Sequence, residues 1–136
     1  MKTSFLLHLR RFELAAGSCL ALSACAPMIA TAPVAIEVTQ PSAAARRIQI
    51  LMATTVGLDT GYSRTLAAKS VWSRVGRLPQ GEVYRPVGTI FTIEGRQVHE
   101  AYLVIRDKTL VGFYLPGEQN YSPLSTAVPL DLGEVE

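Results

Sequence analysis

Three short runs of β-branched and aromatic residues constrain the fold of this chain more than any other feature. The runs cover residues 89–93, 98–105 and 110–115, and polar turns at 94–97 and 106–109 separate them. Runs of this length and composition with tight turns between them are typical of consecutive antiparallel strands. The sequence therefore predicts an antiparallel meander.

Side chains alternate between the two faces of a strand, so the pattern also predicts what each face carries. One face is predicted to be buried and to consist of Phe91, Ile93, Ala101, Leu103, Ile105, Val111, Phe113 and Leu115. The opposite face still carries Ile90, Tyr102, Val104 and Tyr114, so it is not plainly solvated. Both faces are expected to be covered, as in a small barrel or sandwich. We predict a mainly β fold in which the meander closes into one of these forms.

The segments around the meander are predicted mostly as further extended structure. Turns at 57–61 and 78–81 separate strand-like runs, the second of which contains the only tryptophan. Residues 62–70 have some helical propensity but no clear caps, so helix and strand both remain open there. Residues 121–130 are marked by prolines and are expected to extend along a sheet edge. Residues 131–136 are predicted to be a loose tail.

The first 24 residues have the layout of a secretory signal peptide. Lys2, Arg10 and Arg11 form a charged start, and an apolar stretch follows over residues 14–24. That stretch is too short to cross about 30 Å of hydrocarbon as a permanent helix. The buried helix of a soluble domain is the alternative interpretation.

The stretch Leu22-Ser23-Ala24-Cys25 resembles the lipobox of bacterial lipoproteins. The resemblance implies cleavage between Ala24 and Cys25, and acylation of Cys25. It also implies an outer-membrane position facing the periplasm, because Ala26 is not the aspartate that tends to retain lipoproteins at the inner membrane. Acyl chains add about 0.8 kcal/mol of membrane affinity per buried methylene, so the expected partner is the membrane, held through the anchor on Cys25.

This interpretation divides the chain into four parts. They are a signal peptide at 1–24, an acylated cysteine with a flexible tether at 25–45, a small β domain at 46–130 and the tail at 131–136. Proline, alanine, serine and threonine dominate the tether, which could extend tens of ångströms at about 3.1 Å per residue and keep the domain clear of the lipid headgroups. Residues 34–38 alternate and could be a short strand or part of the linker.

Processing at the lipobox would remove or modify most of the cysteine and histidine side chains that could act in catalysis or bind a metal. Cys19 and His8 would be lost and Cys25 would be acylated, which leaves His99 as the only imidazole and no free thiol. A Cys/His zinc site and a cysteine nucleophile are then excluded, and we expect no cofactor. From Cys25 onward, eight arginines and two lysines balance ten acidic residues. A neutral domain lacks the excess positive charge that binds the phosphates of nucleic acid, so nucleic acid is not an expected partner.

Four residues of the meander are candidates for a functional surface: His99, Glu100, Tyr102 and Tyr114. His99 and Glu100 are neighbours on a predicted strand, point to opposite faces and cannot act on one substrate atom. A hydrolase using Glu94, Glu100 or Asp107 is therefore disfavoured, and Asp59 is interpreted as a turn residue.

Two functions remain open at this stage. The first is a non-catalytic envelope lipoprotein whose small β domain binds another protein or stabilises an envelope assembly. The second is a module that binds a small ligand or a glycan through its exposed aromatic side chains. The first is preferred, because the sequence offers a localisation signal and no arrangement of catalytic residues.

Overall fold

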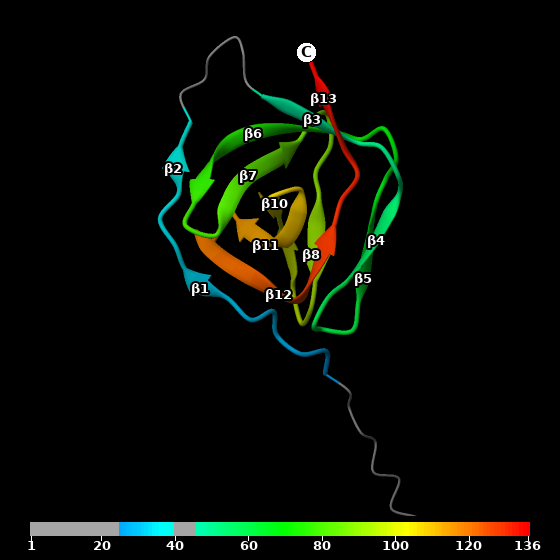
Figure 1. Cartoon of the computed structure of the whole chain (residues 1–136). Coiled ribbons are helices and arrows are strands. Elements are labelled where there is room, and N and C mark those ends of the chain that lie inside the picture. Colours follow the sequence, from blue (N-terminus) through cyan, green and yellow to red (C-terminus); the bar gives the residue numbers. More distant parts are fainter. Residues whose placement is uncertain (1–24, 40–45) are drawn as a thin grey trace, which may run out of the picture.

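The computed structural model describes residues 25–39 and 46–136, and all regular structure in these ranges is β-strand (Figure 1). Every strand pair is antiparallel, which confirms the predicted mainly β, antiparallel fold. The strands are β1 (Ala32–Pro33), β2 (Glu37–Val38), β3 (Arg47–Ile50), β4 (Thr54–Gly57), β5 (Ser63–Leu66), β6 (Val71–Leu78), β7 (Gly81–Pro86), β8 (Thr92–Glu94), β9 (Val98–Glu100), β10 (Tyr102–Arg106), β11 (Thr109–Leu115), β12 (Asn120–Pro129) and β13 (Leu132–Val135). The predicted signal peptide at 1–24 lies outside the described residues.

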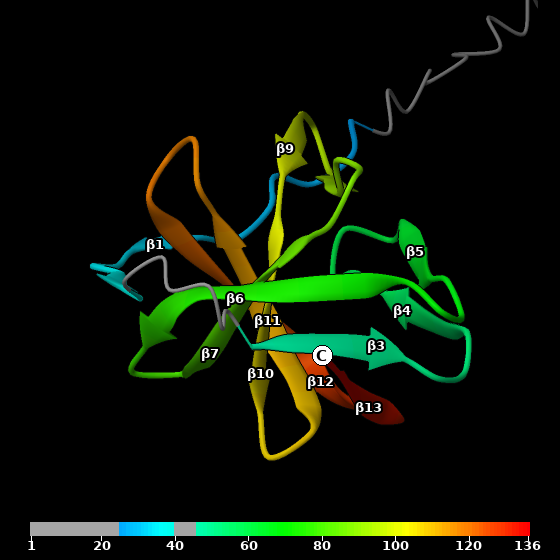
Figure 2. The same cartoon turned by 90° about the horizontal axis from the view of Figure 1, so that it is seen from above.

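The main sheet has nine strands, eight of them in the order β1-β12-β11-β10-β7-β6-β3-β13, with β2 paired to β6 beside this path. The order runs from one edge to another, so of the two predicted forms, barrel or sandwich, a closed barrel is not found among the described residues. β12 pairs with β11, β13 pairs with β3, and only Leu130 and Asp131 join β12 to β13. The curled sheet is seen from above in Figure 2.

The predicted meander is present, with one break. β10 and β11 form a hairpin whose turn residues Asp107 and Lys108 have positive φ values of 50° and 58°, as a two-residue hairpin turn requires. The predicted run 98–105 is interrupted at Ala101, which is fully buried and whose amide donates to the Phe91 carbonyl. β8 therefore pairs with β9, while β10 pairs with β7.

The buried face was predicted correctly except at Val111. The main core cluster contains the other seven predicted residues together with Trp72, whose ring meets Phe91 edge-on at 5.4 Å. The pairing register of β11 with β12 shifts between Leu110 and Gly112, as at a β-bulge. A bulge inserts one extra residue and changes which side chains face inward. Leu110 consequently enters the main core, and Val111 packs on the other face.

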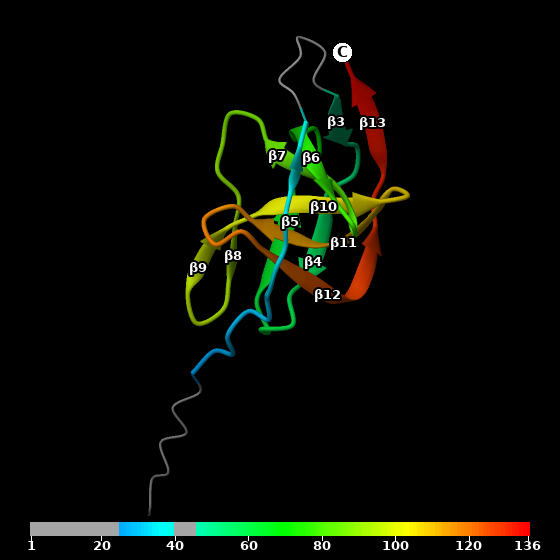
Figure 3. The same ribbon diagram turned by 90° about the vertical axis from the view of Figure 1, so that its left-hand side faces the viewer.

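The other face of the sheet is also covered, as predicted. Its cluster consists of Leu78, Val83, Val104, Tyr114 and Tyr121. Val34 and Ile36 pack against this cluster from the N-terminal segment, which we call the strap (residues 27–39). Figure 3 shows the strap, in blue and cyan, running across the sheet.

The strap replaces most of the predicted flexible tether. β1 pairs with β12 and β2 pairs with β6, and the Val34 and Thr39 amides donate to the carbonyls of Gln119 and Val75. The prediction of a flexible tether is therefore wrong for residues 32–33, which form β1. Of the two alternatives left open for residues 34–38, the structure has a short strand at residues 37–38, and Val34 and Ile36 cover a face of the sheet. Residues 40–45 lie outside the described residues.

Two glycines allow the strap to approach the sheet closely. A Cβ atom at Gly76 would lie 2.6 Å from the Glu37 carbonyl oxygen and 2.8 Å from the Ile36 side chain. A Cβ atom at Gly95 would lie 2.8 Å from the Pro27 carbonyl oxygen. Both distances are too short for a side chain, so glycine is required at each end of the strap for backbone approach.

The remaining predictions have mixed outcomes. Residues 63–66, within the stretch left open between helix and strand, form β5. Residues 121–130 are extended along β11 as most of β12. The prediction of a loose tail at 131–136 is wrong, because β13 completes the hydrogen bonding of β3, which would otherwise be left at a sheet edge.

Candidate functional site

The four predicted surface residues do not converge on one site. Glu100 is exposed, and His99 and Tyr102 are partly buried. Tyr114 is only 4% exposed, so its prediction as a surface residue is wrong: it faces the side of the sheet that the strap covers. Tyr102 and Tyr114 are a cross-strand pair with ring centroids 6.3 Å apart.

Burial also decides how these two tyrosines ionise. Removal from water raises the pKa of the Tyr114 hydroxyl. Burial is also the main cause that raises the pKa of Tyr102, with Glu100 adding to the shift and Arg85 opposing it. Both hydroxyls therefore stay protonated at neutral pH and can act as hydrogen-bond donors.

His99 instead pairs with a residue that the sequence analysis did not select. Its Nδ1 atom lies 2.7 Å from the Glu118 carboxylate, which belongs to the turn between β11 and β12. The pair lines an open groove of about 210 Å³ that also includes Met28, Arg96 and Asn120. Nineteen residues separate His99 from Glu118, and no spacing rule for a single strand or hairpin would link them.

The groove offers little chemistry beyond this pair. A carboxylate can orient an imidazole as in an acid–base dyad, but catalysis also needs a nucleophile or substrate group placed beside the free ring nitrogen. The nearby Asn120 amide donates to the Thr31 hydroxyl at 3.3 Å, which links β12 to the strap. Within residues 25–39 and 46–136, no group of three or more metal-ligating side chains is present.

Asp59, interpreted as a turn residue, lies in the β4–β5 turn and has a structural contact. Its carboxylate accepts hydrogen bonds from the Ser125 hydroxyl at 2.6 Å and from the Ser125 amide at 3.4 Å. These bonds attach the β4–β5 hairpin to β12. The Asp59 carboxylate thus has a structural role in the fold.

The strap, the β8–β9 turn and the β4–β5 turn meet at one end of the molecule. The Arg96 amide donates to the Pro27 carbonyl at 3.1 Å, and the Thr60 hydroxyl donates to the Glu94 carbonyl at 2.7 Å. Cys25 is exposed and precedes Pro27 by two residues. Figure 3 shows the start of the strap beside the β8–β9 hairpin. We call this region, residues 25–29, 58–62 and 94–98, the anchor end.

The loop between β7 and β8 lies at the opposite end of the molecule (Figure 3). Val87 and Ile90 are 43% and 71% exposed. The prediction that Ile90 belongs to a strand over 89–93 is wrong, because β8 begins only at Thr92. These residues line an open hollow of about 490 Å³ together with Arg47 and Arg85. We call this surface the loop hollow. The sequence analysis missed it because its residues come from different strands and a loop.

No family model, curated protein or solved structure matches this chain. Across the part of the chain that the structure describes, there is also no helix of the length and apolarity that a membrane span requires.

Proposed function

We propose that this protein is a non-catalytic bacterial envelope lipoprotein, anchored through Cys25 to the periplasmic face of the outer membrane, whose β domain binds another envelope protein. The observation that carries the proposal is the separation of the two ends. Cys25 is exposed at the anchor end, while the loop hollow presents exposed apolar and basic side chains at the other end. A domain with this layout faces a partner with the surface remote from its anchor.

The composition of the loop hollow favours a protein partner. Val87 and Ile90 are large apolar side chains that water covers in the free protein, and burial of such side chains drives association. Arg47 and Arg85 are also exposed beside them. Arginine is enriched in protein interfaces and forms bidentate pairs with carboxylates. An acidic segment with apolar side chains is the complementary partner surface.

The anchor is tested by a single substitution. We expect Cys25→Ser to abolish incorporation of labelled palmitate and to leave an uncleaved precursor, because the thiol is the atom that is acylated. The measurements are lipid labelling in cells and the mass of the protein. Normal maturation of the variant would reject the lipoprotein proposal.

The partner surface is tested by site-specific photo-cross-linking in cells. A photoreactive side chain at Ile90 is expected to give one dominant cross-linked product. The matched control is the same group at Val38, which is 70% exposed on the strap. No product at Ile90 would contradict the proposed interaction surface.

The groove beside His99 supports binding of a small ligand as a second candidate function. It combines a carboxylate-paired imidazole with Arg96 and the apolar side chain of Met28. Its volume of about 210 Å³ is below the range of about 300–1,000 Å³ that is typical of ligand pockets, so we rank this function second. Thermal stabilisation of the protein by a cell-wall fragment, lost in Glu118→Gln, would favour it.

A further inference from the structure

We infer that the lipidated protein rests with its anchor end directly on the headgroup region of the membrane, in a fixed orientation. The inference depends on the proposed acylation of Cys25. It differs from the arrangement expected of a long tether, which would leave the domain free to tumble above the lipid surface.

The first argument is the length of chain between the anchor and the fold. A free tether over residues 25–45 would reach about 65 Å at about 3.1 Å per residue. The strap, however, is bonded to the fold from Pro27 onward, through the Arg96 amide. Two residues span at most about 7 Å, so Pro27 must lie within that distance of the acylated residue. The β8–β9 turn is therefore held at the membrane surface.

The second argument is the strength of this attachment along the strap. Contacts continue from Pro27 at the β8–β9 turn, through β1 on β12, to β2 on β6. Gly95 fits closely against Pro27 and Ile29, with no room for a side chain between them. Because the strap is fixed at both ends, the domain cannot swing about residues 27–39.

The third argument is the composition of the anchor end. Met28, Val98 and Tyr62 are 68%, 64% and 44% exposed there. Methionine and valine side chains gain free energy on leaving water, and tyrosine is enriched at membrane–water interfaces because its ring is apolar and its hydroxyl polar. Arg96 is exposed in the same turn and can pair with lipid phosphates.

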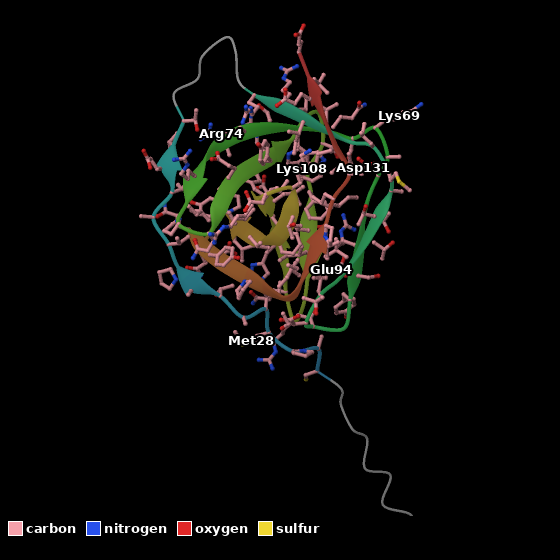
Figure 4. All side chains as sticks on the ribbon, viewed as in Figure 1. Met28, Lys69, Arg74, Glu94, Lys108 and Asp131 are labelled. Atoms are coloured by element: carbon pink, nitrogen blue, oxygen red, sulfur yellow. The ribbon has the colours of Figure 1, made fainter. Side chains whose placement is uncertain are left out.

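Charged side chains lie at the end of the molecule away from the anchor end. Lys69, Arg74 and Asp131 lie in the part of the molecule away from Met28, as Figure 4 shows. Arg74 pairs with Glu82 within the fold, whereas Lys69 and Asp131 are exposed, and removing an unpaired charge from water costs free energy. Because Val87 and Ile90 are also exposed at this end, the orientation is set by the attachment of the strap next to Cys25 and not by apolar exposure alone.

The orientation is tested by fluorescence quenching with brominated lipids. The acylated protein is purified from membranes, checked by mass, and reconstituted into vesicles that contain phosphatidylcholine brominated on the acyl chains. Val98→Trp reports on the anchor end and Ile90→Trp on the opposite end, and the buried Trp72 gives the same background in both. We expect the added quenching to be several-fold greater for Val98→Trp. Equal quenching at the two positions would overturn the inference.

A second variant tests whether the strap sets the orientation. Gly95→Ala places a Cβ atom 2.8 Å from the Pro27 carbonyl oxygen and 2.9 Å from the Ile29 side chain, so the start of the strap must shift relative to the hairpin. We expect the difference in quenching between Val98→Trp and Ile90→Trp to fall in this background. An unchanged difference would contradict the role of the docked strap.

A third sample separates this inference from the proposed function. The chain from Cys25 onward contains one thiol, so it can be coupled in vitro to a maleimide-headgroup lipid. Absence of acyl chains on the cellular protein would reject the lipoprotein proposal, whereas the coupled protein still reports the orientation. In that sample too, stronger quenching of Val98→Trp supports the inference and equal quenching overturns it.

Discussion

Replacement of Gly76 by alanine should release the strap from the sheet. Gly76 is buried in β6, and an added Cβ atom would lie 2.6 Å from the Glu37 carbonyl oxygen and 2.8 Å from the Ile36 side chain. Neither contact is compatible with van der Waals radii. The strap is the element most easily displaced, because it is held by short pairings, whereas β6 pairs with β3 and β7.

The size of the effect follows from what the strap covers. Val34 and Ile36 are partly buried against the cluster that contains Val83 and Val104. Full burial of such a side chain stabilises by about 1.5–3 kcal/mol, so partial burial of the two contributes about 2 kcal/mol. Loss of the hydrogen bonds that accompany them adds about 1 kcal/mol. We therefore expect Gly76→Ala to lower the free energy of unfolding by about 2–3 kcal/mol.

Two measurements together identify the mechanism. Urea denaturation gives the change in the free energy of unfolding, and hydrogen exchange gives the local effect. The Val34 and Thr39 amides, which donate to Gln119 and Val75, should lose protection from exchange. The Ala101 amide in the core should keep the protection that the new free energy of unfolding allows. Gly57→Ala is the matched control, since a Cβ atom there meets nothing within 4 Å.

The reasoning would be refuted by a Gly76→Ala variant as stable as the control with Val34 and Thr39 still protected. That result would mean that the sheet accommodates the Cβ atom while the strap stays in place. A loss of stability without a local change at the strap would instead show that β6 itself is distorted.

Two further predictions concern the core and its tyrosines. Phe113 is 1% exposed and stacks on Phe91 with ring centroids 6.1 Å apart. Phe113→Ala should therefore lower the free energy of unfolding, measured by urea denaturation, by about 3–5 kcal/mol. An unchanged free energy of unfolding would reject the core as described. Burial raises the pKa values of Tyr84, Tyr102, Tyr114 and Tyr121 above about 10, so the unfolded chain releases these protons first as the pH rises. The contribution of these hydroxyls to stability should be complete below about pH 10 and be lost above it. Denaturation midpoints measured across this range should fall less in Tyr84→Phe than in the parent protein, and an equal fall would contradict the assignment.

Local patterns were sufficient for the strands and turns of the domain. The hairpin turn at Asp107 and Lys108 and the turn predicted at 57–61, which the structure has at 58–62, were predictable because turn geometry depends on a few adjacent residues. The side chains of the buried face followed from strand alternation at every predicted position except Val111. A bulge there changes the alternation by one residue, and no local signal marks it apart from Gly112, which lies against the Ser122 carbonyl.

Long-range pairing could not be predicted in the same way. The strap looked like a tether because its composition of proline, alanine and threonine is that of a linker, and only the exposed second face of the sheet gives it a place to bind. Pairing of β13 with β3 and the contact of His99 with Glu118 depend likewise on the assembled sheet. The candidate site was therefore harder to predict than the fold class.

The junction of β12 and β13 has a consequence for how the protein reaches its final location. Residues 132–135 pair with residues 47–50, so a strand late in the described sequence completes the pairing of a much earlier one. Contacts this distant in sequence form slowly, because a long loop must close before they contribute. A nascent chain in which residues 132–135 have not yet been made would leave β3 unpaired on that side. Under the proposed function, late pairing of β3 would favour export of the polypeptide before its sheet is fully formed.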